Sequence, residues 1–278
     1  MKQLRAGVMG WPVDHSRSPV LHGFWLKAYS IEGSYVRLPV PPESLGRALG
    51  ELHEKGFSGV NLTVPHKEAA LVHLDGITAE ARQIGAVNTV FLTAEGKLLG
   101  TNTDAYGFLA NLTSAAPMWR PDNGPAVVLG AGGAARAVCH ALLSEGVAEI
   151  RVVNRTLARA EALAISLSPR RIVPMPWGAN GDALRDAALL VNTTILGMKD
   201  QAPLVVDLAK LSPAAVVNDI VYMPLETPLL AAARLRGNPA VDGLGMLLYQ
   251  AQPSFAGWFG VRPEVTPALR DHVLASMK

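Results

Sequence analysis

The sequence predicts an α/β fold of two domains, and three observations lead to that prediction. Strand-like and helix-like segments alternate along the whole chain, which is the pattern of parallel sheets joined by crossover helices. A glycine-rich loop, Gly130 to Ala135, stands in the middle of the chain, directly after an apolar run. The 278 residues are enough for about two domains of ordinary size.

The elements follow from this alternation in chain order. In the first domain we expect strands at 5–9, 34–40, 59–63 and 87–92, and helices at 19–29, 42–55 and 65–74. In the second we expect strands at 126–129, 149–154, 172–175, 189–193 and 215–221, with a helix from Ala135 to about Glu145. We expect a helix beginning near Asp104 to bridge the two sheets. We also expect the segment 244–278 to be helical and to return to the first domain.

The glycine loop, Gly130-Ala131-Gly132-Gly133-Ala134-Ala135, has the spacing G-x-G-x-x-A. Between a strand and a helix this spacing is typical of a dinucleotide-binding turn, because glycines let the backbone approach a pyrophosphate at the helix N-terminus. A tight turn that binds nothing is the alternative. We therefore expect residues 104–243 to form a Rossmann-like, doubly wound dinucleotide-binding domain, and residues 1–103 with 244–278 to form an α/β substrate domain.

The end of the next strand indicates which dinucleotide is bound. Asn154 and Arg155 stand where an NAD site usually carries an acid for the ribose 2′-hydroxyl. An arginine there suits a 2′-phosphate, and a cation at a helix start otherwise opposes the helix dipole. The sequence therefore favours NADP over NAD.

Composition excludes several classes of protein. The residues are 49% apolar and 17% charged, and the net charge of +2 is spread without a basic stripe, which argues against binding nucleic acid. No apolar run reaches the ~18 residues that a membrane span needs, and residues 1–5 lack the apolar core of a leader peptide. The single cysteine, Cys139, cannot form an internal disulfide and agrees with a reducing compartment. We therefore expect a cytoplasmic protein.

Polar residues follow the first expected strand. Ser18 is a good N-cap and Pro19 a good first helical residue, so helix capping alone explains them. The free backbone N–H groups of a helix start also form an anion site, where Ser16 and Ser18 would hold a carboxylate. The local sequence leaves both interpretations open.

The second cluster is Asn61-Leu62-Thr63-Val64-Pro65-His66-Lys67, which places Lys67 in the first turn of an expected helix. A cation there opposes the dipole, and positions that break a local rule are expected at functional sites. The dipole would ease deprotonation of the ammonium, which suits proton transfer. A solvent-facing lysine is the alternative. We interpret His66 as a packed or surface imidazole rather than a metal ligand, because no second His or Cys falls at metal-ligand spacing.

Three further polar residues complete the candidate site. Asn88 lies in or beside an apolar strand, where a buried amide needs partners that a hydroxylated ligand would provide. Asp104 either caps the following helix or keeps the Lys67 ammonium charged. Gln250 follows Met246 by one helical turn, so both side chains lie on one face of the expected helix. The alternative is a plain amphipathic helix with Gln250 on its solvent-facing side.

Taken together and in this order, the segments resemble those of the shikimate dehydrogenase family. The resemblance covers nearly the whole chain, at residues 15–19, 61–67, 85–89, 102–104, 130–134, 154–156 and 242–246. Two positions depart from commoner forms of the family. Leu62 replaces a frequent valine, and Thr193 stands within Asn-Thr-Thr where Asn-Ala-Thr is usual. Neither departure touches the expected chemistry.

The resemblance implies a reaction and a set of site residues. The reaction is the reversible, NADPH-dependent reduction of 3-dehydroshikimate to shikimate in aromatic amino acid biosynthesis, with no metal. The implied catalytic pair is Lys67 and Asp104, with the substrate contacts Ser16, Ser18, Thr63, Asn88, Asp104, Tyr222 and Gln250. The implied NADP contacts are Gly130, Ala131, Gly132, Gly133, Ala134, Asn154, Arg155, Thr156, Arg159, Ile220, Gly243 and Met246.

Other functions remain as alternatives. A quinate/shikimate dehydrogenase of broader specificity often accepts NAD, against which Arg155 argues. A folate-linked dehydrogenase of similar build does not suit the paired serines. A non-catalytic, nucleotide-dependent regulator is disfavoured because Lys67 and Asp104 are both present. We expect a small-molecule substrate, no nucleic-acid or membrane partner, and either a monomer or a homodimer.

Overall fold

The structure is a computed structural model that describes residues 4–277. The chain divides into two compact units, of which the first comprises Met1–Thr103 with Leu248–Lys278 and the second Asp104–Leu247. The second boundary lies within the helix α10 (Leu244–Phe259) rather than at its start, where the sequence analysis divides the domains. None of the helices among the described residues is long and apolar enough to cross a bilayer.

The first unit is built on one six-stranded sheet. Its strands lie in the order β2-β1-β3-β5-β6-β4. Their bounds are β1 Leu4–Gly10, β2 Gly33–Pro39, β3 Gly59–Leu62, β4 Gly76–Ile77, β5 Thr89–Leu92 and β6 Leu98–Thr101. The strands β1, β2 and β3 run parallel, as alternation with helices predicts.

Strand β5 departs from the parallel arrangement that the alternation predicts. It runs antiparallel to both β3 and β6. A short turn joins β5 to β6, in which the Thr93 backbone N–H donates to the Lys97 carbonyl at 3.0 Å. Only antiparallel neighbours can be joined by so short a connection, so the turn reverses this strand.

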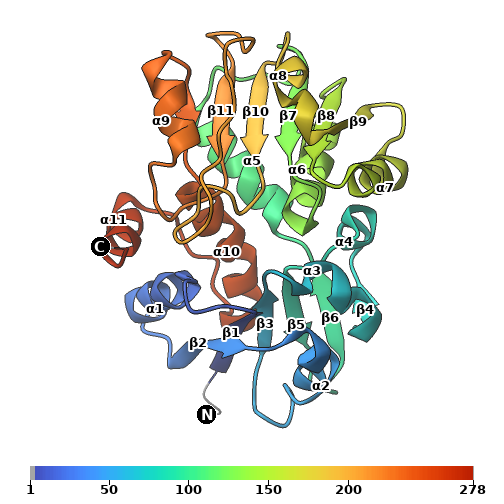
Figure 1. The fold of residues 1–278 in the computed structure, drawn as a ribbon. Helices are drawn as coiled ribbons and strands as arrows, with labels where there is room; N and C mark the ends of the chain where they lie inside the picture. Colours follow the sequence, from blue (N-terminus) through green and yellow to red (C-terminus); the bar gives the residue numbers. More distant parts are fainter. Residues whose placement is uncertain (1–3, 278) are drawn as a thin grey trace. The chain divides into compact units, whose positions relative to one another are not determined.

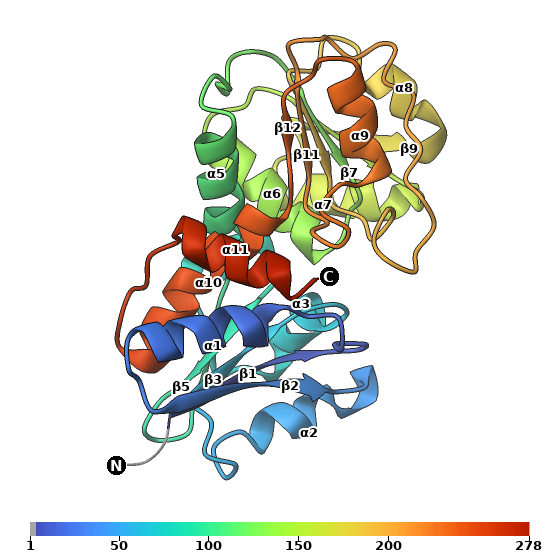
Figure 2. The ribbon, with the colours of Figure 1, turned by 90° about the vertical axis from the view of Figure 1, so that its left-hand side faces the viewer.

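Helices cover both faces of this sheet. Their bounds are α1 Ser18–Ala28, α2 Leu45–Gly50, α3 His66–Ala69, α4 Ala79–Ile84 and α11 Pro267–Ala275, with short 3-10 turns η1 Pro42–Ser44 and η2 Ala70–His73. Figure 2 shows α1 on one face of the sheet and α2 on the other. The expected helices at 42–55 and 65–74 are shorter than predicted, the first ending at Gly50 because glycine is a poor helix former.

The C-terminal segment forms two helices, α10 and α11. Gly260 follows α10 with φ of +77°, and its N–H donates to the Ala256 carbonyl at 2.9 Å. Glycine adopts this left-handed conformation readily, so it ends the helix and turns the chain toward α11. The Trp25 indole of α1 donates to the Glu264 carbonyl at 3.0 Å, which attaches the segment between α10 and α11 to α1.

An aromatic cluster packs between α1, β2 and α10 in this unit. His22 of α1 is fully buried and stacks on Tyr35 of β2, with ring centroids 3.9 Å apart and an interplanar angle of 4°. Trp25, Phe255 and Trp258 surround the same imidazole at 5.8–5.9 Å. Because these neighbours provide no charge partner, burial lowers the pKa of His22 to about 3.

The second unit is built on a six-stranded parallel sheet in the order β12-β11-β10-β7-β8-β9. Its strands are β7 Ala126–Leu129, β8 Ile150–Asn154, β9 Ile172–Pro176, β10 Leu189–Asn192, β11 Val216–Asp219 and β12 Ala240–Val241. Its helices are α5 Asp104–Ala115, α6 Gly133–Ser144, α7 Leu157–Leu167, α8 Asn180–Ala183 and α9 Pro228–Leu235, with the 3-10 turn η3 Trp177–Ala179. Figures 1 and 2 show this sheet between α5 and α6 on one face and α9 on the other.

This strand order confirms the predicted doubly wound topology. Counted along the chain from β7, the order is three, two, one, four, five, six, in which the direction of winding reverses between β7 and β10. Ligands of such sheets bind outside the carboxyl ends of the strands at the point of reversal. The glycine loop that follows β7 lies at that point.

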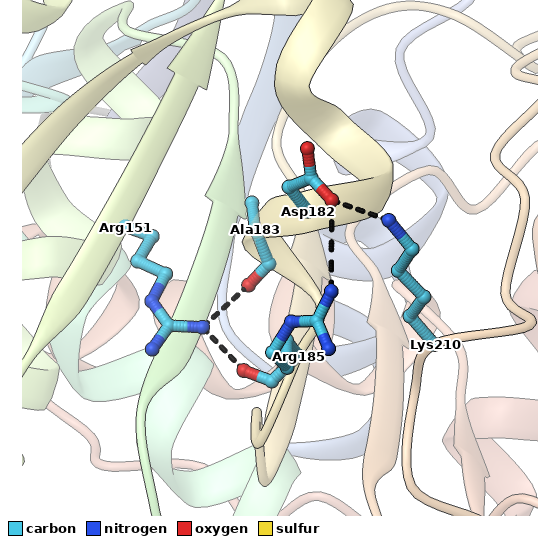
Figure 3. Close-up of polar contacts among 5 residues, drawn as sticks. All are labelled: Arg151, Asp182, Ala183, Arg185 and Lys210. Carbon is cyan, nitrogen blue, oxygen red and sulfur yellow. Dashed lines mark hydrogen bonds and ion pairs between the residues drawn. The ribbon is translucent and has the colours of Figure 1, made fainter.

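Far from the glycine loop, polar contacts attach α8 to its neighbours (Figure 3). Arg151 of β8 donates to the Ala183 carbonyl at 2.9 Å and also to the Arg185 carbonyl, at the C-terminal end of α8. Asp182 pairs with Lys210, which lowers the pKa of that exposed carboxyl. These contacts satisfy carbonyls that a four-residue helix leaves open.

Candidate active site

Polar side chains of the first unit meet near the carboxyl ends of β1 and β3. Asn88, 2% exposed, is the centre of this group. Its Oδ1 accepts the Thr103 backbone N–H at 2.8 Å and the Thr89 hydroxyl at 3.0 Å. Because a backbone N–H can only donate, the orientation of the amide is fixed, and Nδ2 faces the Gln250 Oε1 at 3.3 Å.

The orientation of Asn88 determines that of Gln250. Since Gln250 Oε1 is the acceptor of Asn88 Nδ2, its own Nε2 is the donor end that points away from Asn88. Asn88 and Gln250 are 162 residues apart in the sequence, and the structure brings them together as the sequence analysis expects of site residues. The Gln250 side chain is buried, so the alternative that it lies on the solvent-facing side of its helix is wrong.

The serine segment follows β1. The Ser18 backbone N–H donates to Ser16 Oγ at 3.3 Å, and Arg37 of β2 holds the Ser16 carbonyl with two N–H groups at 3.2 and 2.7 Å. The sequence analysis treats Ser18 as an N-cap, but it is the first residue of α1, and the N-cap is Arg17 without a side-chain capping bond. Ser18 is therefore not the N-cap, and it is Ser16 Oγ that accepts the N–H of the first residue of the helix.

The segment after β3 carries Thr63 and Lys67. Thr63 packs against Gly10, where an added Cβ would come within 2.4 Å of the Thr63 methyl carbon. The Lys67 carbonyl accepts the Val87 N–H at 2.7 Å, which ties this turn to the segment that leads to Asn88. Lys67 is the second residue of α3, but that helix has only four residues. The dipole effect that the sequence analysis expects is correspondingly small.

His66 is packed, which is one of the two positions that the sequence analysis leaves open. Its Nε2 lies 2.8 Å from the Val40 carbonyl, and the imidazole is buried. Burial lowers the pKa of His66, so the ring is neutral at pH 7. No group of three or more His, Cys, Asp and Glu within residues 4–277 could hold a metal ion.

Five polar residues of this group were given no site role by sequence reasoning. They are Tyr35, Asn61, Thr89, Thr103 and Ser254, all buried. Asn61 donates to the Asn88 carbonyl at 3.1 Å, to Thr89 at 3.0 Å and to Ser254 at 3.3 Å. A buried amide within an apolar strand, the signal that identified Asn88, was present at Asn61 as well.

In the second unit, the glycine loop connects β7 to α6. Gly130 has φ of +107°, and an added Cβ would lie 2.7 Å from Thr193 Oγ1, so the turn requires glycine there. Gly132 differs, because a Cβ at that position would meet no atom within 4 Å. The loop therefore leaves open space beside Gly132, at the N-terminus of the twelve-residue helix α6.

The ends of the neighbouring strands lie close to this loop. The Gly130 N–H donates to the Val153 carbonyl at 2.8 Å, and Asn154 Nδ2 donates to the Thr156 carbonyl at 2.8 Å. Thr156 is the N-cap of α7, and Arg155 is exposed. Arg159 is exposed in the first turn of the same helix. Two exposed arginines thus follow β8.

Asp219, at the end of β11, connects three segments of the second unit. Its Oδ1 accepts Asn192 Nδ2 at 2.9 Å and the Val221 N–H at 3.0 Å, and its Oδ2 accepts the Thr227 hydroxyl at 2.7 Å. Burial raises the pKa of Asp219, and these hydrogen bonds act in the opposite direction. Asp219 thereby fixes the segment that carries Ile220 and Tyr222.

The start of α10 approaches this segment closely. A Cβ at Gly243 would lie 2.2 Å from the Ile220 carbonyl oxygen, so the structure brings together two of the expected cofactor contacts. Asn111 of α5 donates to the Asp242 carbonyl at 2.7 Å and fixes this turn. Met246 is buried in the first turns of α10.

Known proteins share this arrangement. The family model of the shikimate dehydrogenase substrate binding domain matches residues 8–90, and that of shikimate / quinate 5-dehydrogenase matches residues 120–196. A shikimate dehydrogenase (NADP(+)) of Rhodospirillum rubrum is 58% identical over 272 residues, covering 97% of this chain and 96% of that protein.

Solved structures are similar over nearly their full length. Shikimate 5-dehydrogenase of Thermus thermophilus, in complex with NADP(H) and shikimate, has a TM-score of 0.87 at 42% identity, with 99% of this chain and 100% of that chain covered. Quinate dehydrogenase of Corynebacterium glutamicum, in complex with NAD, has a TM-score of 0.89 at 32% identity, with 98% and 99% covered. These matches show that the chain belongs to the shikimate dehydrogenase family.

Proposed function

We propose that this chain catalyses the reversible NADPH-dependent reduction of 3-dehydroshikimate to shikimate, a step in the biosynthesis of aromatic amino acids. The observation that carries the proposal is the oriented amide pair Asn88 and Gln250 in the unit matched by a substrate-binding family model. Residues 1–103 with 244–278 bind the substrate in this proposal, and residues 104–243 bind NADP.

The polar group of the first unit suits a hydroxylated carboxylic acid. We assign the substrate carboxylate to Ser16 and Ser18, which lie at the start of α1. Thr63, Asn88 and Gln250 are assigned to the hydroxyl groups. In the fixed orientation of Gln250, the amide nitrogen, which is a hydrogen-bond donor, is the end turned away from Asn88. We assign Tyr222, on the segment fixed by Asp219, to the substrate as well.

Lys67 is the proposed acid of the reduction. Bound NADPH supplies the hydride that reduces the ketone carbon. Negative charge then develops on the ketone oxygen, and an ammonium group within reach stabilises it and gives it a proton. In the direction of oxidation, the Lys67 amine accepts the hydroxyl proton. We assign to Asp104 the role of keeping the ammonium charged.

The second unit fits a dinucleotide phosphate. The open space beside Gly132 lies where the backbone of such a loop approaches a pyrophosphate, and the N–H groups of α6 attract its charge. Arg155, with Asn154, Thr156 and Arg159, would hold the 2′-phosphate of NADP. The remaining proposed contacts are Ala131, Gly133, Ala134, Ile220, Gly243 and Met246.

Partners and location follow from the same chemistry. The partner of the site is a small molecule, and we expect a monomer or a homodimer. A cytoplasmic location is supported by the lone cysteine, Cys139, which is buried and free.

The test is a comparison of four substrate and cofactor pairs. The purified protein is given shikimate or quinate with NADP⁺ or NAD⁺, and formation of the reduced nicotinamide is followed by absorbance. We expect shikimate with NADP⁺ to give the highest kcat/KM, with a preference over NAD⁺ of roughly tenfold or more if one charge-assisted contact reads the phosphate. A higher kcat/KM for quinate with NAD⁺ would contradict the proposal.

A further inference from the structure

A cationic side chain is fixed beside the serines to which the substrate carboxylate is assigned. Arg37 lies on β2, and its Nε and Nη2 both donate to the Ser16 carbonyl, at 3.2 and 2.7 Å. We propose that Arg37 makes this segment selective for an anionic acid, because it brings positive charge to the site and holds Ser16 in place. This inference rests on the proposed role of Ser16 and Ser18 in binding the carboxylate.

Arg37 reaches the serine segment because of its position in the sheet. In the parallel pairing of β1 and β2 it lies opposite Val8, close to the end of β1 at Gly10. It follows Tyr35 by one pleat of the strand, so both side chains lie on the same face of the sheet. Since Tyr35 stacks on His22 of α1, this is the face that α1 covers, and Arg37 lies near the start of that helix.

The guanidinium group keeps donors and charge for a ligand. It has more N–H groups than the two that the Ser16 carbonyl accepts. That carbonyl is the only polar partner of Arg37 among residues 4–277, and no carboxylate of those residues pairs with it. The positive charge of Arg37 therefore remains available to an anion bound beside Ser16.

The start of α1 adds few backbone donors of its own. The Ser18 N–H donates to Ser16 Oγ at 3.3 Å, and Pro19 has no N–H. The N–H groups of the next two residues both donate to the Arg17 carbonyl, at 3.1 Å. The backbone groups that usually attract an anion to a helix start are thus occupied within the segment. A charged side chain therefore contributes more here than at a helix start with open N–H groups.

The same contact fixes the Ser16 backbone. The Ser16 N–H donates to the Val13 carbonyl at 3.1 Å, its carbonyl accepts the two N–H groups of Arg37, and its Oγ accepts the Ser18 N–H. Its hydroxyl proton remains for a carboxylate oxygen to accept. Loss of the guanidinium group would therefore release the Ser16 carbonyl and remove positive charge from the site at the same time.

The test compares shikimate with its methyl ester in Arg37→Gln. The ester keeps the ring and its hydroxyl groups and lacks the negative charge. We expect kcat/KM for shikimate to fall about tenfold, as for the loss of one charge-assisted hydrogen bond, and kcat/KM for the ester to change by less than about threefold. KM for NADP⁺ should remain unchanged. An equal fall for both substrates would mean that Arg37 only supports the structure of the segment, and would overturn the inference.

A conservative variant separates the charge from the shape of the side chain. Arg37→Lys keeps the charge but cannot hold the Ser16 carbonyl with two N–H groups of one planar group. We expect this variant to keep most of the preference for shikimate over the ester. It also decides the question if Arg37→Gln does not fold. A lysine variant that has lost the preference for the acid would overturn the selectivity that we assign to charge.

Salt gives an independent measurement of the same charge. Raising the ionic strength from about 0.01 M to about 1 M shortens the screening length from ~30 Å to ~3 Å. Arg37 is partly buried, so salt reaches it, and KM for shikimate should rise in the unchanged protein and much less in Arg37→Gln. The matched control is Arg47→Gln, at an exposed arginine of α2 in the same unit, which should keep both the KM and its salt dependence. Equal salt dependence in Arg37→Gln and the unchanged protein would contradict the inference.

Ser16→Ala separates this inference from the proposed function. A raised KM for shikimate in Ser16→Ala, with an unchanged kcat/KM in Arg37→Gln, overturns the role of Arg37 alone. Unchanged constants in both variants refute the carboxylate site as well. A preference for quinate over shikimate would contradict the proposed function and leave the role of Arg37 standing, because quinate carries a carboxylate too.

Discussion

At the scale of single residues, buried polar side chains distinguish the site from the core. Asn61 and Asn88 lie in apolar surroundings, and each is fully partnered through backbone groups that fix its orientation. The sequence identified Asn88 by this argument but not Asn61, because it could not show which hydroxyls lie beside each strand. Ser254 is 193 residues from Asn61 in the chain, a contact that only the fold supplies.

His22 shows the opposite case, a buried polar side chain outside the site. Neither ring nitrogen has a hydrogen-bond partner in the part of the chain that the structure describes. The folded protein keeps the ring neutral, with a pKa of about 3 against an ordinary value of 6.5. The unfolded chain therefore binds more protons between these values, and this group destabilises the fold as the pH falls below 6.5.

We therefore predict that His22→Phe reduces the sensitivity of the fold to acid. Each unit of pH below 6.5 costs about 1.4 kcal/mol through this group, so between pH 7.5 and 5 the unchanged protein should lose about 2 kcal/mol more than the variant. Urea unfolding at the two pH values measures the difference. His66 is present in both proteins and cancels. Equal losses of unfolding free energy in the unchanged protein and in His22→Phe would mean that His22 is not buried as a neutral ring.

A second prediction concerns the cofactor arginine. Arg155→Ala should weaken NADPH binding by about 2 kcal/mol and leave NADH binding unchanged, because only NADPH carries the 2′-phosphate. Fluorescence titration of both reduced cofactors measures the two affinities. Arg170, exposed beyond the other end of α7, supplies the control Arg170→Ala. Equal losses of NADPH and NADH affinity in Arg155→Ala would contradict the assignment of Arg155 to the 2′-phosphate.

At the scale of elements, local signals predicted whether a segment is a helix or a strand better than where it ends or in which direction it runs. The strand–glycine–helix unit at 126–144 was recognised because each part has its own local signal. The antiparallel strand β5 was assumed parallel, since the reversal depends on a five-residue turn between two short apolar runs. The early end of α2 at Gly50 reflects the low helix propensity of glycine, which the apolar pattern of residues 42–55 had outweighed in the prediction.

The glycine loop allows folding and binding to be separated. Gly130→Ala should lower stability, because its φ of +107° is strained for alanine and the new Cβ would lie 2.7 Å from Thr193. Gly132→Ala should leave the Tm unchanged and weaken NADP⁺ binding, since its Cβ meets only the open space. Thermal unfolding and cofactor titration of both variants test this. Unchanged NADP⁺ affinity in Gly132→Ala would show that the space is not used by the cofactor.

At the scale of the whole molecule, the first unit is completed by the end of the chain. Leu269 and Val273 of α11 are fully buried. Trp25 of α1 and Tyr29, the C-cap residue of that helix, form hydrogen bonds with the segment before α11. The sequence predicted that the C-terminal helices return to this unit. The break at Gly260, which lets α11 turn back, was not recognised, because glycine within a helical pattern does not by itself predict an end.

This arrangement predicts the effect of loosening α11. Leu269→Ala should lower the free energy of unfolding by about 2–5 kcal/mol, as for other large-to-small changes in a core. Urea unfolding measures the loss, and shikimate binding should weaken because the substrate residues belong to this unit. Leu235→Ala, at an exposed leucine of α9, is the control and should have little effect. No difference between the two variants would contradict the packing of α11.

The central claim is that Lys67 supplies the proton of the reaction, and turnover of Lys67→Ala tests it most directly. We predict a kcat lower by roughly a hundredfold or more, with NADP⁺ affinity unchanged by calorimetry. Lys97→Ala, in the turn between β5 and β6, is the matched control and should turn over normally. A kcat for Lys67→Ala close to that of the unchanged protein, with both ligands bound, would contradict the account.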